Sequence, residues 1–258
     1  MLALALILLG QQSCPNGQFG PGAECRTLSV PEDRARPDGR KIPIRYVVLR
    51  ATGRRQPEAV FLFNGGPGAP STGMAGLARG PFGRVREFRD FVLVDQRGTG
   101  ASNGLMCDLE ARRYPARAFG HVFDPAFFAR CRAQLEKQAD LTRYVTDIAV
   151  QDIDAVREAL GYEQVILWGG SFGTRIAQAY ARRYPERVKA MVLDGVVPLD
   201  FSIPLTYAAS LQQSLDRILA GCRARASCRD SFPDLDSQWN ALVERFRRGP
   251  IGTRVTPR

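Results

Sequence analysis

The sequence is poor in the residues that build zinc sites. Among its 258 residues there is one histidine, His121, and none of its six cysteines lies in a C-x-x-C spacing. Zinc centres draw on cysteine and histidine ligands at such short spacings. The sequence therefore predicts no metal site, and no motif in it implies an organic cofactor.

A basic run interleaved with aromatic residues, the pattern typical of a nucleic-acid interface, is also lacking. The net charge is +10, and such a balance can favour nucleic acids or membrane surfaces. The arginines, however, are scattered, as in the pairs at 112–113, 182–183 and 247–248. We interpret them as a solvated basic surface and predict no nucleic-acid partner.

The apolar run MLALALILLG at residues 1–10 is too short to span a bilayer, which takes about 20 residues. It resembles the apolar core of a signal peptide, although no charged segment precedes it. We therefore expect residues 1–13 to be signal-peptide-like, the true start to lie upstream, and the protein to be secreted or periplasmic without a stable membrane span. The alternatives are a buried strand or a lipoprotein anchor at Cys14, although Gln11, Gln12 and Ser13 form a poor cleavage site.

The cysteines fall into three close pairs, namely Cys14 with Cys25, Cys107 with Cys131, and Cys222 with Cys228. An even number of cysteines after a signal-like start favours disulfides formed in an oxidising compartment. The alternative is six buried free thiols, as a cytosolic origin would require.

Short apolar runs alternate with helical patterns after a lead-in over residues 14–57. The lead-in has strand character at Arg26–Val30 and Lys41–Leu49. Further runs that fit buried parallel strands are Ala59–Phe63, Phe91–Val94, Val165–Trp168 and Ala190–Leu193. A helix is predicted over 147–160, and another follows residue 171 and ends at Pro185. This alternation predicts an α/β fold with a doubly wound, mostly parallel sheet over residues 14–200.

After Pro198 the pattern becomes helical only. Two amphipathic stripes stand out there, Ala208, Leu211, Leu215, Ile218 and Leu219, and then Trp239, Leu242, Val243 and Phe246. Stripes of this kind more often pack than bind a cofactor. We interpret residues 201–258 as the beginning of a helical cap domain.

The pentapeptide Gly169–Gly173 has the form G-x-S-x-G, with Ser171 at its centre. It follows a predicted strand and precedes a predicted helix, which is the context of a nucleophile elbow. Glycines two before and two after the serine leave room for close approach of strand and helix. The alternative is a glycine-rich turn with an incidental serine. The pattern predicts Ser171 as a catalytic nucleophile.

A second glycine-rich segment, Asn64–Gly68, follows the predicted strand at 59–63. A tetrahedral intermediate needs two N–H donors aimed at its oxyanion. We expect one from Phe172, which follows the nucleophile, and the other from Gly65 or Gly66. A phosphate loop is disfavoured because no Lys-Ser or Lys-Thr follows the glycines, and a purely structural turn is the alternative.

The third signal is the segment Asp95–Ser102, DQRGTGAS, at another strand end. Charged side chains there can order the loops of an active site through hydrogen bonds. We expect Asp95 and Arg97 to have this supporting role instead of a catalytic one.

The glycine loop, the DQRGTGAS segment, GGSFGT and the stretch YARRYPERVKAMVLDGVVP occur in one order. From about Cys25 to Asp234 the chain resembles the prolyl iminopeptidase and tripeptidyl aminopeptidase branch of the α/β hydrolases, most closely its secreted members. The resemblance implies a serine exopeptidase that frees short peptides or single residues from a peptide N-terminus. Asn64 departs from it, because many relatives begin this loop with histidine.

The catalytic triad is the larger departure. In this fold an acid and a histidine follow the serine, yet no histidine follows Ser171. The resemblance places both beyond a cap domain, and residues 251–258 look like the start of another strand. We therefore expect a truncated sequence that lacks the last strands of the sheet and is inactive and marginally soluble as given. Within the chain, His121 and Asp194 are the weaker candidates for the base and the acid.

The sequence thus predicts hydrolysis of peptide or amide bonds through an acyl-serine intermediate. One alternative is a carboxylesterase on small esters, because the same elbow serves both bond types. Another is an inactive remnant that only binds peptides, which the missing histidine favours. No particular oligomeric state is predicted.

Overall fold

The computed structural model describes residues 12–14, 17–107, 125–202 and 205–249. The chain divides into two compact units, Met1–Leu199 and Asp200–Arg258. The division lies next to the boundary between residues 200 and 201 that the change to helical patterns predicts. Each unit is described by itself.

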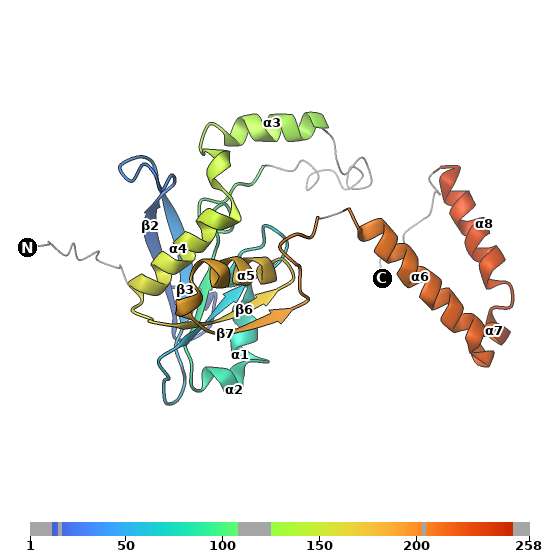
Figure 1. The fold of residues 1–258 in the computed structure, drawn as a ribbon, viewed down its shortest axis with the longest axis horizontal. Helices are drawn as coiled ribbons and strands as arrows, with labels where there is room; N and C mark the ends of the chain where they lie inside the picture. The colour runs from blue at the N-terminus through green and yellow to red at the C-terminus, as the bar shows by residue number, and fades with distance from the viewer. Residues whose placement is uncertain (1–11, 15–16, 108–124, 203–204, 250–258) are drawn as a thin grey trace, which may run out of the picture. The chain divides into compact units, whose positions relative to one another are not determined.

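The first unit is built on one mixed sheet, in which β2, β3, β6 and β7 are labelled in Figure 1. Its described strands lie in the order β1-β2-β3-β5-β4-β6-β7. Their bounds are β1 Gln12–Ser13, β2 Ala23–Pro31, β3 Lys41–Leu49, β4 Ala59–Phe63, β5 Phe91–Val94, β6 Val165–Gly170 and β7 Val188–Asp194. Strands β1, β2, β3 and β5 pair antiparallel, whereas β5, β4, β6 and β7 pair parallel. The predicted parallel strands therefore form one half of the sheet.

Helices cover both faces of the sheet, as a doubly wound fold requires. The short helices α1 (Ala75–Arg79) and α2 (Gly83–Arg86) connect β4 to β5. The helix α3 (Pro125–Leu135) precedes α4 (Thr146–Ala159), which leads into β6, and α5 (Gly173–Arg183) connects β6 to β7. The predicted α/β architecture is confirmed.

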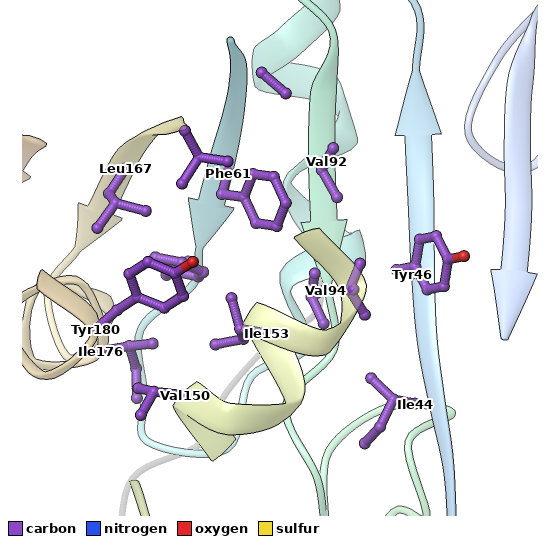
Figure 2. Packing of buried hydrophobic residues seen from close by; sticks show 14 of the residues in the cluster. Ile44, Tyr46, Phe61, Val92, Val94, Val150, Ile153, Leu167, Ile176 and Tyr180 are labelled. Carbon is purple, nitrogen blue, oxygen red and sulfur yellow. The ribbon is translucent and has the colours of Figure 1, made fainter. Parts of the chain in front are cut away.

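The larger core cluster lies between the sheet and the helices α4 and α5. Figure 2 shows Val150 and Ile153 of α4 and Ile176 and Tyr180 of α5 directed toward the strand residue Phe61. A second cluster, on the other face, includes Leu62, Leu93 and Ala78 of α1. Alternate residues of one strand serve the two clusters, since successive side chains point to opposite faces.

The second unit consists of the helices α6 (Tyr207–Ala224), α7 (Ala226–Ser231) and α8 (Leu235–Arg247). The apolar stripes predicted to pack are not buried within this unit. Leu211 is 71% exposed and Ile218 is 69% exposed. The predicted helices form, but the apolar residues of their stripes do not become buried by contacts inside this unit.

Three disulfides join the predicted pairs Cys14–Cys25, Cys107–Cys131 and Cys222–Cys228. The first links the segment before β2 to that strand, and the third closes the junction of α6 and α7. No helix in the described ranges combines the length and the apolar content that crossing a bilayer requires.

Candidate active site

Ser171 lies on the turn between β6 and α5, with its side chain exposed. Its φ is 51°, in the left-handed region that residues other than glycine rarely adopt. Hydrogen bonds fix the turn on both sides. The Ser171 N–H donates to the carbonyl oxygen of Asp194 at 2.8 Å, and the Ser171 carbonyl accepts from the Thr174 N–H at 3.0 Å and hydroxyl at 2.7 Å.

The glycines on either side of Ser171 are required by space. A Cβ on Gly169 would lie 2.6 Å from the carbonyl carbon of Gly173, and one on Gly173 would lie 2.7 Å from the carbonyl carbon of Phe63. Real Cβ atoms do not come so close to backbone. Strand β6, helix α5 and the end of β4 therefore meet only because both positions lack a side chain.

The glycine loop lies directly against the serine. Strands β4 and β6 are parallel neighbours, so their carboxyl ends meet at the same edge of the sheet. A Cβ on Gly65 would lie 3.0 Å from the Ser171 Cβ and 3.4 Å from its Oγ. The loop continues through the exposed Gly66, whose φ is 111°. The structure thus brings together two of the predicted segments.

The backbone N–H groups beside Ser171 differ in whether they have a hydrogen-bond acceptor. The Gly65 N–H donates to the side-chain Oδ1 of Asn64 at 2.8 Å. Within the described part of the chain, the N–H groups of Gly66 and Phe172 donate to no protein acceptor. These two amides therefore keep their hydrogen-bonding capacity for a ligand.

Asp95, at the end of β5, supports the loop that follows the glycines. Its carboxylate accepts the Thr72 N–H at 2.9 Å and the Thr72 hydroxyl at 3.2 Å. Burial raises the pKa of Asp95, and the hydrogen bonds from Thr72 oppose that rise. Its side chain contacts Thr72 and the Ala101 N–H, and the supporting role expected from the sequence stays a prediction.

Arg97 ties several segments together below the site. Its guanidinium makes a bidentate, buried ion pair with Asp152 of α4, at 2.6 and 2.9 Å. It also donates to the carbonyl oxygens of Glu32 at 2.7 Å and Arg143 at 3.1 Å. Arg97 therefore holds the end of β2, the segment before α4 and α4 itself in one arrangement.

Of the two weaker triad candidates, only Asp194 lies among the described residues. Asp194 ends β7, and its backbone carbonyl holds the Ser171 amide, while its exposed side chain has no hydrogen-bond partner among the described residues. His121 lies outside the described residues. Within the described ranges, no group of three or more histidine, cysteine, aspartate or glutamate side chains could hold a metal ion.

Thr174 was not singled out from the sequence, yet it fastens the elbow. Its hydroxyl donates to the Ser171 carbonyl at 2.7 Å and accepts the Val197 N–H at 2.8 Å. A threonine in the first turn of a helix often bonds nearby backbone in this way. Its position three residues after the serine was the available signal.

Two cavities flank the Phe172 side chain. The larger has a volume of about 750 Å³ and is lined by Phe172 and Arg175, by Arg182 and Arg183 farther along α5, and by Asp147 of α4. The smaller, of about 250 Å³, is lined by Phe172 together with Gly68 and Gln96. Phe172 thus lines both a cavity with three arginines and a cavity beside the glycine loop.

Comparison with known families agrees with this geometry. A family described as "alpha/beta hydrolase fold" matches residues 58–231, which contain β4, the glycine loop, the elbow and β7. The chain belongs to the α/β-hydrolase fold family. The predicted fold and family resemblance are therefore confirmed.

The α/β-hydrolase relatives include three with peptidase names. The chain is 31% identical to the serine protease Hip1 of Mycobacterium tuberculosis, over 84% of this chain and 45% of that protein. It is 25% identical to the tripeptidyl aminopeptidase of Streptomyces lividans, over 91% and 48% respectively. It is 31% identical to the proline iminopeptidase of Neisseria gonorrhoeae, over 59% and 37%. The chain spans about half the length of the curated relatives it matches most fully.

Proposed function

We propose that this chain supplies the nucleophile and the oxyanion hole of a serine hydrolase that cleaves peptide or amide bonds near a peptide N-terminus. The observation that carries the proposal is the exposed Ser171 on its left-handed turn, with Gly65 packed against its side chain. The peptidase names of the relatives support the substrate class. The three disulfides support an oxidising, extracytoplasmic location.

In the proposed reaction the Ser171 Oγ attacks the acyl carbon while a general base accepts its proton. The carbonyl oxygen becomes an oxyanion, which accepts hydrogen bonds from the Phe172 N–H and from the glycine loop. The amine then leaves with a proton, and water hydrolyses the acyl-serine. The amino end of α5 also carries the positive end of the helix dipole, which favours negative charge beside Ser171.

A fluorophosphonate probe tests the role of Ser171, because it labels activated serines. The purified protein is treated with the probe, with and without imidazole as an external base. We expect label at Ser171 when imidazole is present, and none in Ser171→Ala. A folded protein that stays unlabelled, or that is labelled at another serine, contradicts the proposal. Label without imidazole would place a base within the chain, and His121→Ala is then the variant to make.

The substrate class is tested separately. Turnover of an aminoacyl or tripeptidyl anilide is compared with that of a simple acyl ester under the conditions that support labelling. Faster turnover of the anilide, lost in Ser171→Ala, is the expected result. Turnover of the ester alone would identify a carboxylesterase, and peptide binding without turnover would identify a binding protein.

A further inference from the structure

The side chain of Asn64 closes the glycine loop. Its Oδ1 accepts the Gly65 N–H at 2.8 Å, and its Nδ2 donates to the carbonyl oxygen of Pro70 at 3.0 Å. One planar amide therefore joins the beginning of the loop to its end. The two contacts also fix its orientation, because rotating the amide by 180° would set oxygen against the Pro70 oxygen and nitrogen against the Gly65 N–H.

The far end of the loop is anchored in turn. The Asn64 N–H donates to the hydroxyl of Ser71, which is fully buried, at 3.3 Å. Thr72 donates twice to the buried carboxylate of Asp95. The loop is therefore held at both ends by side chains, while its middle, Gly66 to Gly68, is exposed.

These contacts distinguish between the two glycine amides. The Gly65 N–H is used inside the loop, so it cannot point at a substrate without losing Asn64. The next amide, that of Gly66, has no acceptor among the described residues, and it belongs to the peptide unit directly after the Gly65 Cα that faces Ser171. The Gly68 amide is likewise unbonded in the described chain, but it lies beyond Pro67.

Resting on the proposed function, we propose that Asn64 is a positioning residue of the oxyanion hole. By engaging the Gly65 N–H and the Pro70 carbonyl, it leaves the Gly66 N–H as the loop's donor to the acyl oxygen.

Two variants of Asn64 separate its two contacts, and a third variant elsewhere is the control. Asn64→Ala removes both. Asn64→Asp keeps an acceptor for the Gly65 N–H, but it loses the donor to Pro70 and places a negative charge beside a developing oxyanion. Asn240→Ala, at an exposed position in α8, is the matched control.

Amide hydrogen exchange followed by NMR tests the assignment without any need for activity. In the unaltered protein we expect the Gly65 amide to be protected and the Gly66 amide to exchange freely. Asn64→Ala should speed exchange at Gly65 by about tenfold, the scale of one lost hydrogen bond, whereas Asn64→Asp should keep it protected. Equal exchange at Gly65 in the unaltered and Asn64→Ala proteins, or protection of Gly66, overturns the proposal.

The rate of fluorophosphonate labelling tests the consequence for chemistry. In both Asn64 variants we expect the maximal labelling rate to fall about tenfold or more, toward the hundredfold cost of losing a donor, with the half-saturating probe concentration nearly unchanged. Labelling at the unaltered rate, with Asn240→Ala also unchanged, overturns the positioning role. Failure of every protein to label at Ser171 would instead count against the proposed function, and amide exchange alone would then decide which amide Asn64 leaves unbonded.

Discussion

Ser171 is one of two described residues other than glycine with positive φ, the other being Asn103. Asparagine tolerates this region because its short polar side chain bonds locally, but serine gains no such relief. A conformation of this kind costs on the order of 1–3 kcal/mol and persists only where the surroundings enforce it. Here the Asp194 carbonyl and the Thr174 hydroxyl and amide enforce it from both sides. In this conformation Ser171 is exposed at the edge of the sheet.

The first prediction concerns Gly65, which has an ordinary φ and lacks only space for a side chain. In Gly65→Ala the new methyl group would press on the Ser171 Cβ and on the Gly170 carbonyl. We expect the rate of Ser171 labelling to fall by about threefold to tenfold, because the neighbours must shift by a few tenths of an ångström and a displacement of about 1 Å costs about a hundredfold. Gly76→Ala is the control, because a Cβ there meets nothing within 4 Å. Unchanged labelling of Gly65→Ala would show that the loop does not approach the serine.

Gly66→Val is expected to lower the labelling rate by about a hundredfold or more, since a bulky side chain would obstruct the proposed oxyanion donor. This variant also strains the loop. Gly66 has a positive φ, and an added Cβ would lie 2.8 Å from the backbone nitrogen of Gly68. Its circular dichroism spectrum and unfolding midpoint must therefore accompany the labelling rate. An unchanged labelling rate in a folded Gly66→Val protein would show that the loop is only a structural turn.

A third prediction concerns Asp90, a buried carboxylate just before β5. Burial raises its pKa, but hydrogen bonds from the Tyr162 hydroxyl at 2.6 Å, the Ala51 N–H and Arg50 outweigh that effect, so that its pKa is lowered from 3.8. Its ionised form therefore stabilises the fold above pH 3.8, and this contribution is lost as the pH falls through the lowered pKa. Urea unfolding across this range should show stability declining toward acid.

Replacing the Asp90 carboxylate should make the decline of stability toward acid pH less steep. Asp90→Asn should be less stable by about 1–3 kcal/mol at neutral pH, since it loses the charged hydrogen bond to Arg50, although Arg50 keeps its pair with Glu24. The difference between the two proteins should shrink below pH 4. Asp38→Asn, at an exposed position, is the control. A difference that is independent of pH would contradict the role given to ionised Asp90.

At the scale of elements, the decisive contact is that of β6, α5 and the end of β4. We expect Gly173→Ala to destabilise the first unit by about 1–3 kcal/mol, because the new Cβ would overlap the Phe63 carbonyl group and force the helix away from the sheet. Unfolding in urea measures this. Gly83→Ala, where a Cβ meets nothing within 4 Å, should stay within about 0.5 kcal/mol of the unaltered protein. Equal stabilities would show that the elements do not approach as closely as described.

The elements whose apolar residues are contiguous could be predicted well from the sequence. Strands β3, β4 and β5 have the bounds predicted for them, because buried strands bounded by turns leave a plain signal. Strand β6 extends two residues farther than predicted, through Gly169 and Gly170. Glycine is a weak strand former, and pairing with Leu193 and Asp194 of β7 is what extends the ladder.

The polar framework of the site was less predictable. The apolar face of α4 gave the helix, but not the burial of Asp152 and Asp154 among its turns. Asp152 pairs with Arg97, and Asp154 accepts from Arg157 and from the Tyr180 hydroxyl. Arg97 and Tyr180 lie far from α4 in the sequence, and only the folded sheet and α5 bring them to this helix. The Asn64 contacts were missed for a different reason, since a loop asparagine gives no periodic signal.

At the scale of the whole molecule, the disulfides make a further prediction. Each bridge closes a short loop and restricts the unfolded chain, which should stabilise the fold by about 2–4 kcal/mol. Peptide mapping without reduction should find Cys14 linked to Cys25, Cys107 to Cys131, and Cys222 to Cys228. Reduction should lower the thermal midpoint of a protein purified from an oxidising compartment. Six alkylatable thiols in the native protein would contradict both the pairing and the proposed location.

The last prediction joins the net charge of +10 to the basic cavity beside Phe172. Arg175, Arg182 and Arg183 line that cavity, and among the described residues that line it Asp147 is the one carboxylate. A positive potential there should attract acidic peptides and weaken with salt, because the screening length falls from about 30 Å at 0.01 M to about 3 Å at 1 M. An acidic peptide should therefore bind more tightly than its glutamine counterpart at low salt, and the two should converge as salt is added.

Fluorescence anisotropy with the labelled peptide pair measures this preference, whether or not the chain turns the peptides over. Arg182→Gln and Arg183→Gln should each reduce the advantage of the acidic peptide by about twofold to fivefold at low salt, the scale of one exposed ion pair. Arg84→Gln, which removes the same charge from α2, should leave the advantage intact, because Arg84 is exposed but does not line this cavity. An equal loss in all three variants would assign the preference to net charge alone. A preference that persists at high salt would assign it to contacts other than charge.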